Sequence, residues 1–443
     1  MTSIAQKFHD EQCRSKSILG FAKEFHLAKT LEQANICKAQ GVGVLTVFIQ
    51  LLTVAFSGVP LSKSLANGKT AGAKDVFYRF MNSTSANWMK FIRLLSSQVI
   101  ARVMAVLPGI GVIILDDTIY KRDRSKKVEL LAHVRDHNDG RYYSGFRCLT
   151  LCFNLGKITI PIDFQLFSSC NEKARINGAR PNLDKRTNGY KLRQSAMGKS
   201  FQSAIEMIGR QRGLVRHVLF DSWFSMPVMF KSMREMDFHG VGMLKTSNNL
   251  YRYKGRFYKL ESLFALVKPF LHRDDSFASM GVELRDGTPF SITFVQDSRR
   301  QRKRGWLAIG TTDLTLSSQQ VISLYSRRWN IEVFFKTVKS YLGFARECQS
   351  RSFDAIVCSV AVVFTRHMIL TWVNLGLPTP ETDGQLFLLL FDEIHECSFP
   401  EALNIVLREI ASLCDNVNAL LDISLRDFIA TLPQYFNTLK AVS

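Results

Sequence analysis

The sequence predicts an α/β protein in which a section that contains a β-sheet is flanked by helical regions at both ends. Apolar residues recur at intervals of three and four up to about residue 105, and again from about residue 350. Between these regions, short runs of β-branched and aromatic residues indicate strands, and two of these runs end in aspartate. We therefore divide the chain into regions 1–105, 106–349 and 350–443.

The first region reads as a small helical domain. Helical periodicity is clearest in Phe21–Thr30, Val42–Phe56 and Trp88–Val106, with breaks at Gly58-Val-Pro60 and Asn67-Gly68. The last region returns to helical patterning, with polar breaks.

The middle region shows a defined order of elements. We expect a buried strand at Gly111–Leu115, a hairpin of Tyr142–Phe153 and Ile158–Leu166, a helix at Lys191–Arg210 and a second buried strand at Val215–Phe220. The buried strands lead into Asp116-Asp117 and Asp221, and open sheets bind ligands at the carboxyl ends of their strands. This order resembles the ribonuclease H-like fold.

A helix further along carries the next group of polar residues, Tyr325, Arg328, Glu332 and Lys339. At about 100° per residue these four side chains fall within an arc of roughly 60°. A separate apolar stripe beside them is suited to packing: Leu324, Ile331, Phe335, Val338 and Leu342. The carboxylate suits a divalent metal, and the cations suit phosphate oxygens.

The interval before this helix is long. Asp221 and Glu332 are 332 − 221 = 111 positions apart, more than a ribonuclease H-like core needs. Strand-like stretches within it predict a β-rich insertion at about 236–312: Gly240–Leu244, Tyr251–Leu260, Phe290–Val295 and Trp306–Thr311.

The spacing Tyr-x2-Arg-x3-Glu-x6-Lys resembles the Y-R-E-K motif of DDE transposases of bacterial insertion sequences, and more narrowly the insertion sequence four family of Tn-five and Tn-ten type. Asp117, Asp221 and Glu332 would then be the catalytic carboxylates and the metal ligands. Three carboxylates from separate elements suit two Mg²⁺ ions, for which Mn²⁺ would substitute. Asp116 is the alternative at the first position, and the family's Asp-Thr pairing favours Asp117.

The resemblance also implies DNA contacts. Tyr325, Arg328 and Lys339 would bind phosphates beside the scissile bond. Trp306 follows a very basic segment that includes Arg302 and Arg304, and the resemblance suggests that it stacks on a base extruded from DNA. A strand aromatic in the core is the alternative for Trp306.

Bulk properties agree with a polyanionic partner. The chain has 58 Lys+Arg against 38 Asp+Glu, which gives a net charge of +20. The nine cysteines are scattered, without zinc spacing, and fit a reducing compartment. We expect no signal peptide and no membrane span, because the apolar stretch Ala355–Thr365 is too short to cross a bilayer.

The sequence therefore predicts a DNA transposase that binds terminal inverted repeats, cuts through a hairpin intermediate and joins the freed end to target DNA. A homodimer in the bacterial cytoplasm, associated with the nucleoid, would hold two ends. The alternatives are a two-metal nuclease of the same superfamily that does not join strands, and a DNA-binding protein that has lost catalysis.

Overall fold

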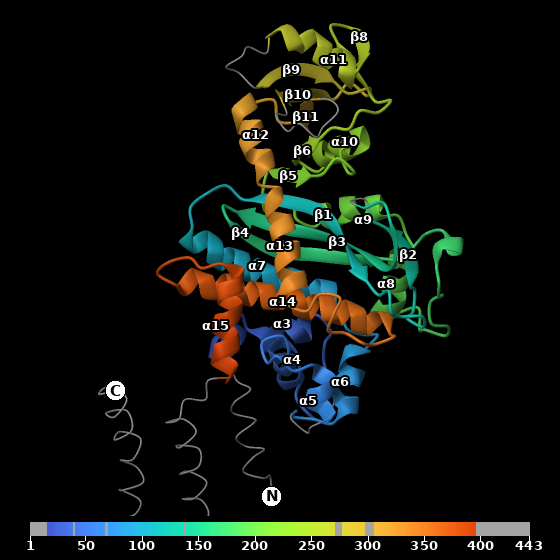
Figure 1. Ribbon diagram of the computed structural model, residues 1–443, viewed down its shortest axis with the longest axis vertical. Helices are drawn as coiled ribbons and strands as arrows, with labels where there is room; N and C mark the ends of the chain where they lie inside the picture. Colours follow the sequence, from blue (N-terminus) through green and yellow to red (C-terminus); the bar gives the residue numbers. More distant parts are fainter. Residues whose placement is uncertain are drawn as a thin grey trace, which may run out of the picture.

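A mixed β-sheet forms the centre of the protein and carries helices on both faces (Figure 1). The computed structural model describes residues 16–38, 40–66, 70–136, 139–270, 277–296 and 305–395. The sheet has 11 strands, and its order is β2-β3-β1-β5-β6-β11-β10-β9-β7-β8, with β4 paired to β3 beside this path.

The core of the sheet is built around β1 (Val112–Lys121), whose continuous apolar start is buried on both faces. It pairs antiparallel with β3 (Tyr142–Leu155) and parallel with β5 (His217–Phe220). Beyond these lie β4 (Ile158–Phe167), antiparallel to β3, and β6 (His239–Met243), parallel to β5. The hairpin turn at Gly156-Lys157 joins β3 to β4, as the sequence indicates.

The later strands extend this sheet. β6 lies in the range expected for the insertion, yet it pairs with the core strand β5 on one side and with β11 on the other. The remaining elements are β2 (Ala132–Arg135), β7 (Leu250–Tyr253), β8 (Arg256–Lys259), α11 (Leu260–Val267), η2 (Lys268–Phe270), β9 (Phe277–Glu283), β10 (Pro289–Gln296) and β11 (Trp306–Thr311). β2 lies beside β3 at the edge of the core, whereas the other elements project from one end of the core in Figure 1.

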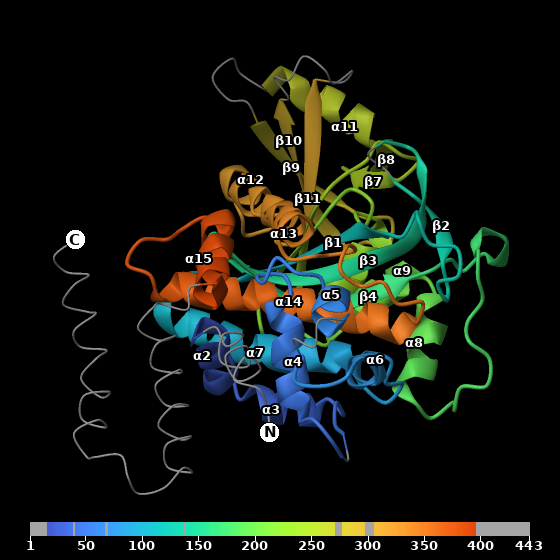
Figure 2. The same cartoon turned by 60° about the horizontal axis from the view of Figure 1, so that its bottom comes forward.

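Helices from the start of the chain lie at the opposite end. They are α2 (Lys16–Glu24), α3 (Leu27–Gln33), α4 (Val44–Thr53), α5 (Leu61–Ala66), α6 (Lys74–Met81) and α7 (Trp88–Val106). α7 and α14 (Phe353–Gly376) pack against each other and against β4, and the earlier helices join the core of the sheet through this pair (Figure 2).

α14 is a buried central helix of 24 residues. The expectation that this apolar stretch is too short to cross a membrane was wrong on length, because a window of it reaches mean hydropathy 1.8 over 18 residues. That window is 94% buried inside the protein, and Arg366 in it bonds to Glu347 and to the carbonyls of Leu51 and Leu52. The described residues contain one helix of this kind, and its burial is typical of a core helix.

Two helices expected to be continuous are interrupted. The predicted helix at Lys191–Arg210 is α8 (Asn188–Ala196) followed by α9 (Ser200–Gly209), because Gly198 favours a turn and Lys199 is extended. The Tyr325–Lys339 helix is α12 (Ser318–Ser326) followed by α13 (Trp329–Ser340). The structure also contains η1 (Glu172–Ala174), α10 (Pro227–Glu235) and α15 (Asp383–His395).

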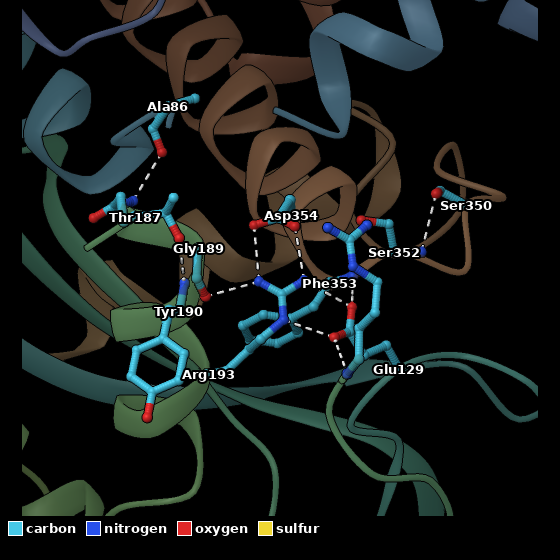
Figure 3. A network of polar contacts seen from close by, with 12 residues as sticks. Ala86, Glu129, Thr187, Gly189, Tyr190, Arg193, Ser350, Ser352, Phe353 and Asp354 are labelled. Carbon is cyan, nitrogen blue, oxygen red and sulfur yellow. Dashed lines mark hydrogen bonds and ion pairs between the residues drawn. The ribbon is translucent and has the colours of Figure 1, made fainter. Parts of the chain in front are cut away.

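A buried ion network fastens α8 to the start of α14 (Figure 3). Arg193 of α8 binds Asp354 at 2.7 Å and Glu129 at 2.6 Å. Glu129 also accepts a hydrogen bond from the backbone N–H of Phe353, at 3.1 Å, so it caps the first turn of α14. The network joins three segments that are distant in sequence beneath the sheet.

Candidate active site

Two aspartates meet where β1 and β5 stop pairing. Leu115 pairs with Phe220 at the end of the parallel ladder, so the next residues, Asp116 and Asp221, lie side by side in register. β1 itself continues to Lys121, which differs from the expectation that it ends at the aspartates. The carboxyl end of the parallel pairing, rather than the end of the strand, locates this site.

Asp116 is a strongly perturbed carboxyl group. Burial, followed by the nearby charge of Asp221, raises its pKa to about 8, and the charge of Arg328 acts in the opposite direction. Its Oδ1 accepts the backbone N–H of Asp117 at 2.8 Å. A buried carboxylate next to a second carboxylate is stabilised by a nearby cation. Residues with strongly shifted pKa values are also enriched at functional sites.

Arg328 connects Asp116 to the third carboxylate. Its Nη1 lies 3.1 Å from Asp116 Oδ2, and its Nη2 forms an ion pair with Glu332 one turn along α13. Because α13 packs against β1, this contact brings the helix carboxylate over the face of the sheet that carries Asp116. Arg328 therefore joins Asp116 to Glu332, and Asp221 follows Asp116 in register at the end of the β1–β5 ladder.

The adjacent Arg327 fixes the break between α12 and α13. It donates to the side-chain and backbone oxygens of Asn154, at 3.0 and 2.6 Å, and to the Ile110 carbonyl at 2.8 Å. These bonds secure the end of α12 to the sheet. Arg328 can then point at the carboxylates.

The remaining members of the predicted motif lie around the same cluster. Tyr325 is buried, and burial raises its pKa to about 12. The charge of Arg328 lowers this pKa, whereas the charges of Asp221 and Asp116 raise it. Lys339 donates from Nζ to Thr118 Oγ1. Thr118 is two positions beyond Asp116 and so lies on the same face of β1. All four positions of the motif therefore face one region.

The structure does not place Asp117 with this group. Neighbouring residues on a strand point to opposite faces, and Asp117 Oδ1 pairs with Arg147 of β3 at 2.6 Å on the other face of the sheet. We expected Asp117 to lie with Asp221 and Glu332. The structure instead places Asp116 on the face of β1 that Arg328 and Glu332 cover. Sequence reasoning preferred Asp117 through the family's Asp-Thr pairing, whereas strand register would have indicated Asp116.

The other predicted DNA contacts differ in their surroundings. Trp306 of β11 stacks on Phe264, with ring centroids 4.5 Å apart, and meets Phe294 edge-on at 5.6 Å. One face of the indole is therefore covered inside the extension of the sheet while the residue is half-buried, and the stacking role stays a prediction. Arg302 and Arg304 lie outside the described residues.

The three acidic residues fit a divalent metal by donor chemistry. Carboxylate oxygens are the ligands that Mg²⁺ prefers, and the raised pKa of Asp116 indicates excess negative charge. Arg328 lies between Asp116 and Glu332 and offsets part of that charge. These three carboxylates do not converge on one metal position, because in the described part of the chain no group of three or more His, Cys, Asp or Glu side chains is close enough together to hold an ion.

Residues 107–369 match the family model described as "Transposase DDE domain". No curated protein matches the chain as a relative. Among solved structures, a cryo-EM structure of a piggyBac transposase synaptic complex with hairpin DNA aligns with TM-score 0.43 and 13% identity, over 94% of this chain and 85% of that chain.

Proposed function

We propose a function from one premise: the chain belongs to the transposase DDE domain family, whose model matches residues 107–369. In this proposal the protein is a transposase that cuts DNA strands and joins them by phosphoryl transfer, with Asp116, Asp221 and Glu332 as the catalytic carboxylates. The contact of Arg328 with both Asp116 and Glu332 is the observation that supports this set best.

The fold supports the proposal. A ribonuclease H-like core is expected to have an antiparallel hairpin beside a central strand that pairs in parallel with the next two. The order β4-β3-β1-β5-β6 has this arrangement. The β-rich segment before α12 continues the same sheet, as an insertion between the second and third carboxylates.

The chemistry divides among the residues of the site. Asp116, Asp221 and Glu332 would hold Mg²⁺ or Mn²⁺, which when bound lowers the pKa of an attacking water or hydroxyl and stabilises the leaving oxygen. Arg328 and Lys339 supply positive charge for the phosphates on either side of the scissile bond. Tyr325 is a neutral phenol near pH 7, as any tyrosine is, and burial raises its pKa further. Its hydroxyl can therefore donate to a phosphate oxygen.

The finer features follow from the resemblance to the insertion sequence four family. We propose cut-and-paste transposition through a hairpin, with terminal inverted repeats and target DNA as the substrates. A homodimer would hold two ends in the synaptic complex, since coordinated cutting needs two active sites. The proposed location is the bacterial cytoplasm at the nucleoid, with no membrane association.

The test is strand cleavage and strand transfer on DNA ends taken from the sequence that borders the gene. Asp116→Asn and Glu332→Gln should lower Mg²⁺-dependent cleavage at least about a thousandfold, as expected when several kcal/mol of charge stabilisation are lost. DNA binding should persist, because phosphate contacts supply most of the affinity. Glu235→Gln, on the surface of α10, is the matched control.

The comparison of Asp116→Asn with Asp117→Asn decides the first carboxylate. We expect the larger loss at Asp116, because Asp117 acts through Arg147. A larger loss at Asp117 would restore the assignment made from the sequence. Cleavage without joined products would instead favour the two-metal nuclease, and normal cleavage by both Asp116→Asn and Glu332→Gln would defeat the proposal.

A further inference from the structure

A large cavity opens on the face of the sheet opposite to Arg328. Its volume is about 1000 Å³, within the range of cavities that hold small organic ligands. The edge strand β2, the start of α9 and the loops after β5 and β6 line it. It therefore begins one residue from Asp221, because Ser222 and Trp223 belong to its wall.

Asp221 itself positions the aromatic wall of the cavity. Its Oδ1 accepts the backbone N–H of Trp223 at 2.9 Å and that of Phe224 at 3.3 Å. Phe224 is buried, whereas Trp223 is 49% exposed. The same turn thus presents a carboxylate at the candidate active site and a large exposed indole at the cavity.

The fully charged side chains in the lining of the cavity are all cationic. Four basic side chains contribute to it, and the described lining contains no carboxylate: Arg135, Arg147, Lys199 and Lys245. Arg135, Lys199 and Lys245 are exposed, and Lys245 Nζ lies 5.2 Å from the centre of the Trp223 ring. Arg147 reaches the cavity from the ion pair with Asp117. Serines 168, 169, 200, 222, 225 and 247 add hydroxyl donors.

We propose that this cavity binds an unpaired segment of DNA strand beside the cleavage site, with a base stacked on Trp223 and phosphates on Lys199, Lys245 and Arg135. The inference rests on the proposed function, because it takes the Asp221 site as the place of cleavage. An exposed aromatic among cations is what binds single strands without regard to sequence. In this arrangement Asp117 is a positioning residue, which orients Arg147 toward the strand.

A single strand fits the cavity better than a duplex does. Stacking on Trp223 requires a base whose face is accessible, and in a duplex the neighbouring base pairs cover both faces. The cations lie on several walls of the cavity, from β2 to the loop after β6, and this spread suits a nucleic-acid backbone that passes through the cavity. A single bound phosphate would need only one cluster of cations. The position directly behind Asp221 lets a strand separated at the cut leave the active site.

The experiment compares two DNA probes by fluorescence anisotropy without divalent metal, so that no cleavage occurs. One is a blunt duplex, and the other is the same duplex with a short single-stranded tail. Trp223→Ala should lose about five- to hundredfold of the affinity for the tailed probe and change blunt binding little. Trp223→Phe should keep most of the affinity, and Phe257→Ala, an exposed aromatic outside the cavity, should bind as the wild type does.

The outcomes separate the possibilities. Abasic nucleotides in the tail should mimic Trp223→Ala in the wild-type protein, and Lys199→Glu should weaken tailed binding even if Trp223→Ala fails to fold. An unchanged preference for tailed DNA in both Trp223→Ala and Lys199→Glu would overturn the inference, as would full competition by a free nucleotide. Loss of Mg²⁺-dependent cleavage has no part in this readout, so the proposed function and the cavity can fail separately.

Discussion

At the scale of single residues, side chains that are adjacent in sequence make contacts in different places. Arg327 and Arg328 are adjacent, yet one bonds to oxygens of Asn154 and Ile110 while the other faces Asp116 and Glu332. Asp116 and Asp117 divide in the same way between the two faces of β1. In both pairs the local backbone decides which side chain reaches the cluster of carboxylates.

Replacing Arg327 should therefore mainly lower stability, whereas replacing Arg328 should mainly lower the rate of cleavage. Arg327→Ala removes hydrogen bonds from a charged donor to partly buried oxygens, so we expect a loss of about 2–4 kcal/mol of unfolding free energy. Arg328→Gln should change stability less and lower the cleavage rate more. Urea unfolding and single-turnover cleavage of both variants measure this contrast. Equal effects of the two variants on both quantities would contradict the division of tasks.

At the scale of elements, the predictable features were those set by local pattern. The hairpin at Gly156-Lys157 follows from alternation and turn residues, and α14 follows from a long apolar run. Asp116 was named only as the alternative to Asp117, because which of the two faces Arg328 depends on how β1 pairs with its neighbours, which no local pattern contains. Trp223 was passed over because its exposure depends on distant loops, although its place two residues after Asp221 and directly before Phe224 was a usable signal.

The ion network between α8 and α14 gives a prediction at this scale. Burial alone would raise the pKa of Glu129, but the hydrogen bond from Arg193 lowers it overall. Arg193→Met leaves Glu129 and Asp354 buried without a cation, which should cost about 3–5 kcal/mol at neutral pH. Arg186→Ala, which removes an exposed ion pair with Asp184, should change little.

The pH dependence of this loss has a defined sign. In the wild type, the lowered pKa of Glu129 gives stability that is present above its unfolded pKa of about 4.3 and is lost as pH falls. In Arg193→Met, Glu129 is buried without its cation, so the folded pKa of Glu129 should be raised and stability should fall as pH rises. The difference between the two proteins should therefore be larger at pH 8 than at pH 5.5. A constant difference in urea unfolding at both values would rule this out.

At the scale of the whole molecule, the net charge of +20 and the candidate cavity make separable contributions to DNA binding. Charge acts through release of counterions, so the logarithm of the binding constant falls with the logarithm of salt, by about 0.9 for each phosphate neutralised on duplex DNA and about 0.7 on single strands. Stacking displaces no counterion. The salt slope therefore counts phosphate contacts and leaves aromatic contacts out.

This separation yields a prediction for variants within one cavity. Lys245→Ala should reduce the salt slope for tailed DNA by about 0.7, because one phosphate contact to the single-stranded tail is lost. Trp223→Ala should lower the affinity for tailed DNA at every salt concentration and leave the slope unchanged. Arg285→Ala, an exposed cation on the turn between β9 and β10, is the control and should alter neither quantity for the tail. Anisotropy titrations of both probes across a range of salt concentrations provide the measurement. If Trp223→Ala changed the slope while Lys245→Ala did not, the strand would be held by a different set of side chains, and the assignment of a base to the indole would have to be abandoned.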